Sequence, residues 1–105
     1  MTYEELLEFA RRHVGMTLET VTGRRFRVSV YLDSIVFVPE STGLGRSEGR
    51  KGHERFVARY NETGSLRPGD YAGVSRDASY LVALVAAAVR EATPSWNRRR
   101  DRPPR

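Results

Sequence analysis

The chain has 105 residues and no cysteine, and its 18 lysines and arginines against 13 acidic residues give a net charge of +5. This length predicts a single domain, and the lack of cysteine excludes disulfides, thiol nucleophiles and cysteine-based metal sites. With only two histidines, we expect no bound metal and no other cofactor. No apolar run reaches the roughly 18 residues that span a bilayer, and the polar N-terminus lacks a signal-peptide pattern, so we expect a cytoplasmic protein without a membrane partner.

The positive charge is concentrated at the C-terminal end. Residues 93–105 contain five arginines and one acidic residue, which gives this segment +4 and leaves about +1 for the rest of the chain. Its prolines and low apolar content predict a disordered basic tail at 94–105, after a folded domain at 1–93. Trp96 is the one large apolar residue of this tail, and we expect it to fold back on the domain or to dock on a partner.

Residues 3–14 are predicted to form the first helix. Thr2 and Glu5 have the spacing of a capping box, in which each side chain accepts a hydrogen bond from a backbone N–H at the helix start. Apolar residues then recur at intervals of three and four residues, and Gly15 is a typical residue at a helix end.

Three antiparallel strands are predicted between residues 18 and 38. The first covers 18–22 and leads into a turn at Gly23-Arg24. Apolar side chains then alternate with polar ones from Phe26 to Leu32, which is the clearest strand pattern of the chain. After a turn at 33–34, the third strand runs from 35 to 38 and ends at Pro39, which lacks a backbone donor. It is apolar on both faces, so we expect both to be covered.

Two helices follow a glycine-rich loop at 40–52. The first covers about 52–63, with a narrow apolar stripe, and Gly64 is placed to end it. A tight turn is predicted at 67–70, and a buried helix follows, because every residue from Tyr80 to Val89 is apolar. The whole is an α+β fold in the order α-β-β-β-α-α, a three-stranded antiparallel meander packed on helices one and three.

The glycine-rich loop has the position of a phosphate-binding loop, between a strand and a helix. However, Glu48 stands where a dinucleotide fingerprint has glycine, and Lys51 is followed by Gly52 rather than by the serine or threonine of a Walker loop. We therefore expect a flexible connector here.

Basic residues in the loop and the second helix favour nucleic-acid binding, because such groups neutralise phosphates. Arg55 and Arg59 are one helical turn apart and share a face. With the tail, the expected nucleic-acid-binding residues are Arg46, Arg50, Lys51, Arg55, Arg59, Arg98, Arg99 and Arg100.

A second basic group lies near the first hairpin, at Arg24, Arg25 and Arg27. Tyr31 and Tyr60 are candidates for stacking on unpaired bases. We thus expect a small, non-enzymatic module that binds DNA or RNA. The main alternative is a protein-interaction or homodimerisation domain that uses the tail tryptophan or an open strand edge.

A small ribonuclease-like enzyme is the minor alternative. His53, near the start of the second helix among Arg50, Arg55, Arg59 and Glu54, would act as the general acid or base, with the arginines on the developing negative charge. Nothing in the sequence fixes that geometry, so we assign no catalytic residue.

Overall fold

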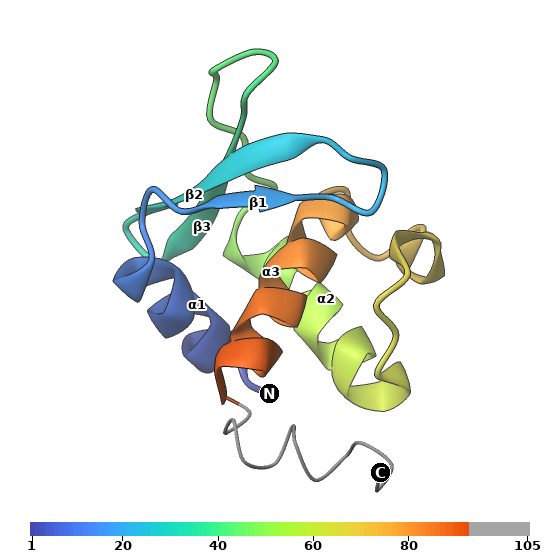
Figure 1. Cartoon of the computed structure of the whole chain (residues 1–105). Helices are drawn as coiled ribbons and strands as arrows, with labels where there is room; N and C mark the ends of the chain where they lie inside the picture. Colours follow the sequence, from blue (N-terminus) through green and yellow to red (C-terminus); the bar gives the residue numbers. More distant parts are fainter. Residues whose placement is uncertain (93–105) are drawn as a thin grey trace, which may run out of the picture.

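The computed structural model describes residues 1–92 and confirms the α+β fold and the expected order of elements (Figure 1). The elements are α1 (Tyr3–Arg12), β1 (Thr17–Glu19), β2 (Arg25–Tyr31), β3 (Ser34–Pro39), α2 (Arg50–Thr63), the 3-10 helix η1 (Pro68–Tyr71) and α3 (Ala78–Ala92). The sheet lies across one end of the molecule, and the three α-helices lie together beneath it. The expected tail, with Trp96, Arg98, Arg99 and Arg100, lies outside the described residues.

The start of α1 is capped as the sequence predicts. The Glu5 N–H donates to Thr2 Oγ1 at 3.1 Å, and the Thr2 N–H donates to Glu5 Oε1 at 2.9 Å. The helix ends at Arg12, two residues earlier than predicted. The chain turns there through Gly15, whose φ of +92° suits glycine, and the Gly15 N–H donates to the carbonyl of Val28.

The three strands form an antiparallel meander in the order β1-β2-β3. Tyr31 is paired with Ser34, so the second turn is Leu32-Asp33, one residue earlier than predicted. The prediction that Leu32 continues the apolar face of β2 is therefore wrong. Leu32 lies in the turn and is 76% exposed. Its φ of +55° is typical of the favoured two-residue hairpin turns, which have a positive φ at the first central residue.

The core is aromatic where the sheet meets α2 and α3. The rings of Phe26 and Phe37, from β2 and β3, meet edge to face with their centroids 5.7 Å apart. Tyr80 of α3 contacts both rings. Phe56 of α2 stacks on Tyr71 of η1 at 4.1 Å. Helices and sheet are thereby joined in one cluster of buried side chains.

The loop after β3 is more than a flexible connector. It turns back beside β3, where Phe37 and Arg46 exchange backbone hydrogen bonds of 2.9 and 2.8 Å. A Cβ atom on Gly45 would lie 3.0 Å from Val36, so the returning backbone packs closely on that side chain. This explains how the second apolar face of β3 becomes partly buried, as its composition predicts.

The two later helices differ from the prediction in detail. α2 begins at Arg50, two residues early, and ends at Gly64 in the left-handed conformation (φ +65°). α3 is not buried all round: Ala83 and Ala86 are partly exposed and Val89 is 38% exposed, because the sheet and the other helices leave one side of it open. None of the described helices is long and apolar enough to cross a membrane.

Candidate nucleic-acid interface

Three arginines from separate parts of the sequence surround one hollow beside the start of α3. Arg24 follows the first hairpin loop, Arg46 ends the loop after β3, and Arg76 stands two residues before α3. The hollow has a volume of about 350 Å³, and its other lining residues all carry hydroxyl groups: Thr20, Thr22, Ser79 and Tyr80. Among residues 1–92, no acidic side chain lines it. Guanidinium and hydroxyl donors at a helix N-terminus match the chemistry of a phosphate group.

Arg24 and Arg76 are exposed, and within the described chain neither guanidinium has an acidic partner or a hydrogen bond. Arg46 is held more firmly. Its Nε lies 3.4 Å from Oδ1 of Asp77, and its Cζ lies 5.4 Å from the centre of the Tyr80 ring, within the range of a cation–π contact. Its side chain is still 51% exposed. The hollow therefore combines two free cations with one that is fixed in position.

Asp77 and Glu48 form a reciprocal clasp behind this hollow. The Glu48 N–H donates to Asp77 Oδ2 and the Asp77 N–H donates to Glu48 Oε2, both at 2.8 Å. The Ser75 hydroxyl also donates to Glu48. These bonds tie the end of the loop to the residue before α3, and they keep Arg46 and Arg76 on the same side of the molecule.

Gly52 is a structural requirement of this clasp. The carboxylate of Glu48 lies over the first turn of α2, where a Cβ atom on Gly52 would meet Glu48 Oε1 at 2.1 Å. Only glycine leaves room for the carboxylate at this point. Gly52, which stands after Lys51 where a Walker loop has serine or threonine, thus has a packing role.

The minor alternative of a ribonuclease-like enzyme requires an accessible His53, and the structure does not provide one. His53 is fully buried, and its Nε2 lies 2.9 Å from Asp77 Oδ2. The ring packs near Phe37 and Tyr3, at centroid distances of 5.8 and 6.4 Å. That alternative needs His53 to act beside the neighbouring arginines, but the helix turns His53 inward because its other faces carry the charged residues. A histidine in this position orients Asp77 and cannot touch a substrate.

The carboxyl group of Asp77 is held in its charged form despite being only 1% exposed. Burial acts to raise its pKa, but the hydrogen bonds from His53 and Glu48 and the positive charge of Arg46 outweigh burial. The pKa of Asp77 consequently lies below its ordinary value. The anchor of Arg46 is therefore an ionised carboxylate over the whole neutral range.

Glu48, His53 and Asp77 are also the described residues whose arrangement most resembles a metal site. One potential ligand atom from each lies within 4.8 Å of the other two. However, Asp77 Oδ2 and Glu48 Oε2 each already accept two hydrogen bonds from this chain. Within residues 1–92, the Nδ1 atom of His53 has no hydrogen-bond partner, whereas metal-bound histidines usually donate their second N–H to an acceptor. The cluster is better explained as a structural clasp.

Two further hollows adjoin the first. A larger one, of about 970 Å³, shares Arg24, Arg46 and Tyr80 with it and extends to Arg25. A smaller one, of about 230 Å³, shares Arg76 and extends to Arg55. The arginines that line the three hollows are called the basic track here: Arg55, Arg76, Arg46, Arg24 and Arg25. One acidic residue lines each of the two outer hollows, Glu40 the larger and Glu48 the smaller.

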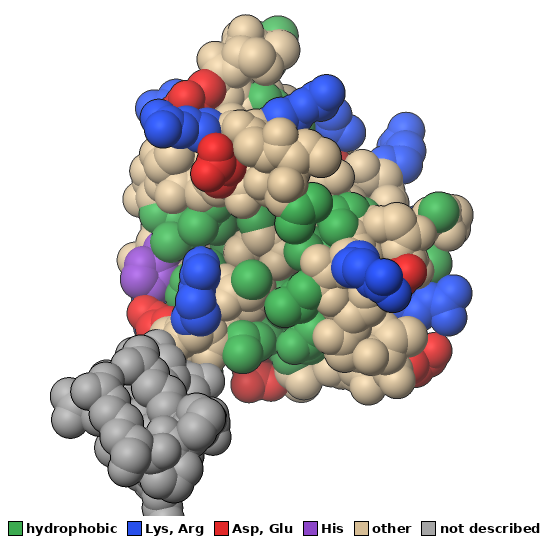
Figure 2. Space-filling model, turned by 45° about the vertical axis from the view of Figure 1, so that its right-hand side comes forward, with side chains coloured by type: hydrophobic (Ala, Val, Ile, Leu, Met, Phe, Trp, Pro, Cys, Tyr) green, Lys and Arg blue, Asp and Glu red, His purple; other side chains and the backbone are tan. Residues whose placement is uncertain are grey.

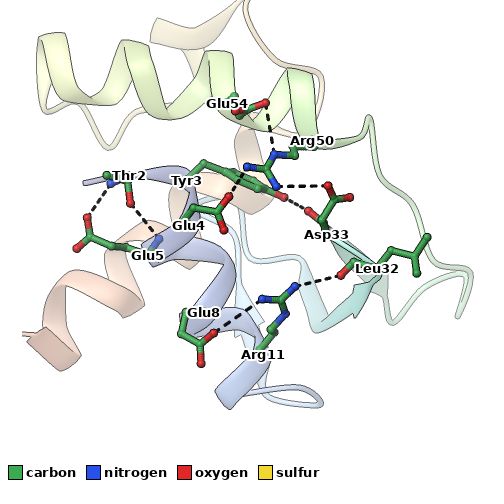
Figure 3. Close-up of polar contacts among 10 residues, drawn as sticks. All are labelled: Thr2, Tyr3, Glu4, Glu5, Glu8, Arg11, Leu32, Asp33, Arg50 and Glu54. Atoms are coloured by element: carbon green, nitrogen blue, oxygen red, sulfur yellow. Dashed lines mark hydrogen bonds and ion pairs between the residues drawn. The ribbon is translucent and has the colours of Figure 1, made fainter.

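The structure brings two of the expected binding residues, Arg46 and Arg55, onto this track and places Arg50 elsewhere. Arg50 lies over the Tyr3 ring at 4.8 Å, between three carboxylates from α1, the β2–β3 turn and α2 (Figure 3). The hydrogen bond that it donates to Glu4 raises the pKa of its guanidinium. Its charge is neutralised within the chain, and it ties these three elements together.

The remaining expected residues of α2 are exposed. Arg55 donates to the carbonyl of Val74 at 3.4 Å, which holds it near the track, and Arg59 pairs with Glu62 at 3.7 Å. Lys51 stands one turn before Arg55 and has no partner among the described residues. Lys51, Arg55 and Arg59 therefore lie along one side of the helix, as their spacing predicts.

Sequence reasoning did not find Arg76. The residue is isolated from the basic clusters in sequence, and only the clasp between Glu48 and Asp77 brings it beside Arg46. The signal available in the sequence was an arginine directly before an aspartate at the start of a predicted helix. No protein-family model, no curated protein sequence and no solved structure matches this chain.

Proposed function

We propose that the protein is a small, non-enzymatic module that binds nucleic acid through the basic track. The observation that carries this proposal is the convergence of Arg24, Arg46 and Arg76 on one hollow whose described lining contains no acidic residue. Phosphate contacts of this kind supply most of the affinity of non-specific binding, and they position a strand without reading its sequence.

Charge separation within the domain supports the same conclusion. Arg50 and Arg12, which line none of the hollows of the track, are paired with carboxylates. Arg24, Arg25 and Arg76 have no acidic partner among the described residues, and neither have Arg27 and Lys51 outside the track. A nearly neutral domain can therefore still present a local positive potential. The described lining of the central hollow carries charge of one sign only, and such a cleft concentrates an oppositely charged ligand.

The test compares two double variants of equal charge. Arg24→Ala with Arg76→Ala removes two free cations of the track, and Arg11→Ala with Arg67→Ala removes two exposed cations that line none of its hollows. Fluorescence anisotropy with labelled DNA and RNA oligonucleotides at low salt should show at least a tenfold loss of affinity for the first pair only. Equal losses, or no binding by the unaltered chain, would refute the proposal.

A second candidate function, self-association, is favoured by an apolar groove along α3. Figure 2 shows hydrophobic side chains gathered across the middle of one face of the molecule, below a region rich in Lys and Arg. The groove has a volume of about 630 Å³, and its apolar lining is Leu18, Val21, Leu66, Val82, Ala83 and Ala86. Sedimentation velocity of the unaltered chain and of Ala86→Glu tests this candidate: a dimer that the substitution dissociates supports it, and a monomer at all concentrations excludes it.

A further inference from the structure

The largest hollow of the basic track lies beside a stack of flat groups that begins in the core. The ring of Tyr80 lies nearly parallel to that of Phe37, at a centroid distance of 5.3 Å and an interplanar angle of 19°. Arg46 lies beside this pair of rings, with its Cζ 5.4 Å from the centre of the Tyr80 ring. Its side chain is 51% exposed, and a planar guanidinium is a group on which another flat group can stack.

Arg46 is fixed before any ligand arrives. Asp77 holds its Nε atom at 3.4 Å, and its backbone is paired with Phe37 through two hydrogen bonds. A side chain held in this way loses little rotational freedom on binding, whereas a free arginine loses a good deal. This distinguishes Arg46 from Arg24 and Arg76, which have no such anchors within the described residues.

The space next to Arg46 is too large for a phosphate group alone. Its volume of about 970 Å³ lies in the range of small-molecule sites, about 300–1,000 Å³. Its wall combines apolar residues, Pro39 and Leu44, with the hydroxyl groups of Ser41 and Thr42. It also contains the carboxylate of Glu40, against the three arginines at positions 24, 25 and 46. Leu44 is 72% exposed at this wall and belongs to no part of the core.

The loop that carries Leu44 is shaped by its own hydrogen bonds. The Gly43 N–H donates to the carbonyl of Pro39 at 2.8 Å, and the Leu44 N–H donates to Thr42 Oγ1 at 3.2 Å. The part of the wall that carries Leu44 is therefore formed without a ligand. A space lined by an anchored guanidinium and an exposed leucine suits a flat, partly apolar group.

We propose that this space receives one unpaired nucleobase, stacked on Arg46, while the adjoining phosphate lies among Arg24, Arg46 and Arg76. The inference rests on the proposed function and specifies its ligand as a single strand, because the bases of a duplex are stacked on one another and cannot enter a hollow. Stacking of unstacked bases on aromatic rings or guanidinium planes is a general mode of single-strand recognition. Such a strand is either DNA or RNA, and the two differ in their sugar.

The experiment measures affinity by fluorescence anisotropy for four labelled ligands at one salt concentration: single-stranded DNA, single-stranded RNA, a DNA duplex, and a DNA strand of the same length made of abasic nucleotides. The abasic strand keeps the phosphates and lacks the bases. We expect the single strands to bind about tenfold more tightly than the abasic strand, which is the contribution of one stacked base. The ratio of DNA to RNA affinity then identifies the preferred sugar.

Two variants alter the stack, and their effect is read from the ratio of affinities for the normal and the abasic strand, in which a change in phosphate contact cancels. Leu44→Ala removes an exposed apolar group without changing charge, and Arg46→Lys keeps the charge but removes the plane. Both should reduce the preference for a normal strand over an abasic strand to less than threefold, with Arg67→Ala as the control that preserves it.

The outcomes separate the two proposals. Equal affinity for the normal and the abasic strand, together with a loss in the Arg24→Ala, Arg76→Ala variant, would overturn the nucleobase inference and leave the phosphate proposal standing. If the double variant bound each ligand as tightly as the unaltered chain does, the phosphate proposal itself would be overturned. A duplex that binds more tightly than both single strands would also overturn the inference.

Discussion

Replacing Asp77 by alanine tests whether the clasp positions the basic track. The substitution removes the acceptor of the Glu48 N–H at 2.8 Å and of His53 Nε2 at 2.9 Å, and it removes the anion 3.4 Å from Arg46 Nε. His53 is fully buried, so its ring loses a partner that water cannot replace without opening the core.

The magnitude follows from these contacts. A buried donor left without an acceptor costs about 1–3 kcal/mol, and Asp77→Ala leaves two such donors, on Glu48 and His53. Because the contacts share one carboxylate and are not additive, we expect Asp77→Ala to lower the free energy of unfolding by about 4 kcal/mol. That is a large part of the roughly 5–15 kcal/mol that stabilises a typical domain.

Urea denaturation followed by circular dichroism measures this difference, with Asp70→Ala as the matched control. Asp70 is an exposed aspartate that pairs with Arg67 at 3.5 Å, and loss of such a surface pair costs less than about 1 kcal/mol. If Asp77→Ala lost no more stability than Asp70→Ala, the clasp would not be a main support of the fold, and the argument that it fixes Arg46 would fail.

Three further predictions concern the same framework. Because the pKa of Asp77 is lowered in the folded state, its contribution to stability should be present above its ordinary pKa of about 3.9 and lost as the pH falls further. Asp77→Asn should therefore be less stable than the unaltered chain at pH 7. In an acid denaturation series, this difference in stability should narrow below a pH of about 4. Gly52→Ala should lower the free energy of unfolding by about 2 kcal/mol through overpacking, since its Cβ would overlap the carboxylate of Glu48. The control, Ala58→Gly on the exposed side of α2, should cost about 1 kcal/mol. Equal melting temperatures for the two variants would contradict this prediction. Phe56→Ala should cost about 3 kcal/mol of unfolding free energy in the same melts, because its fully buried ring stacks on Tyr71. A loss below about 1 kcal/mol would show that neighbouring side chains fill the space that the ring leaves.

Local patterns in the sequence were enough to predict most of the fold. The capping box at Thr2, the alternation from Phe26 to Val30 and the glycine after α2 each act within a few residues, so they can be read without knowledge of the rest of the chain. The turn at Leu32 was misplaced because its position does not depend on local residue types. Hairpin register depends on the pairing of whole strands.

The site could be predicted only in part, because it depends on contacts between distant segments. Glu48 and Asp77 are 29 residues apart, and nothing in their sequence neighbourhoods indicates that they bond. The same contact buries His53 and brings Arg76 to Arg46. Arg50 illustrates the converse: its basic neighbourhood predicts a phosphate contact, but the carboxylates that neutralise it come from α1, the β2–β3 turn and α2.

The salt dependence of binding tests the central claim most directly. The logarithm of affinity for a single strand falls with the logarithm of salt concentration by about 0.7 per phosphate contact. Removing Arg24 and Arg76 together should therefore flatten that slope by about 1.4 relative to the unaltered chain, while the double variant at Arg11 and Arg67 should keep the original slope. Identical slopes for all three proteins would show that the hollow beside α3 holds no phosphate.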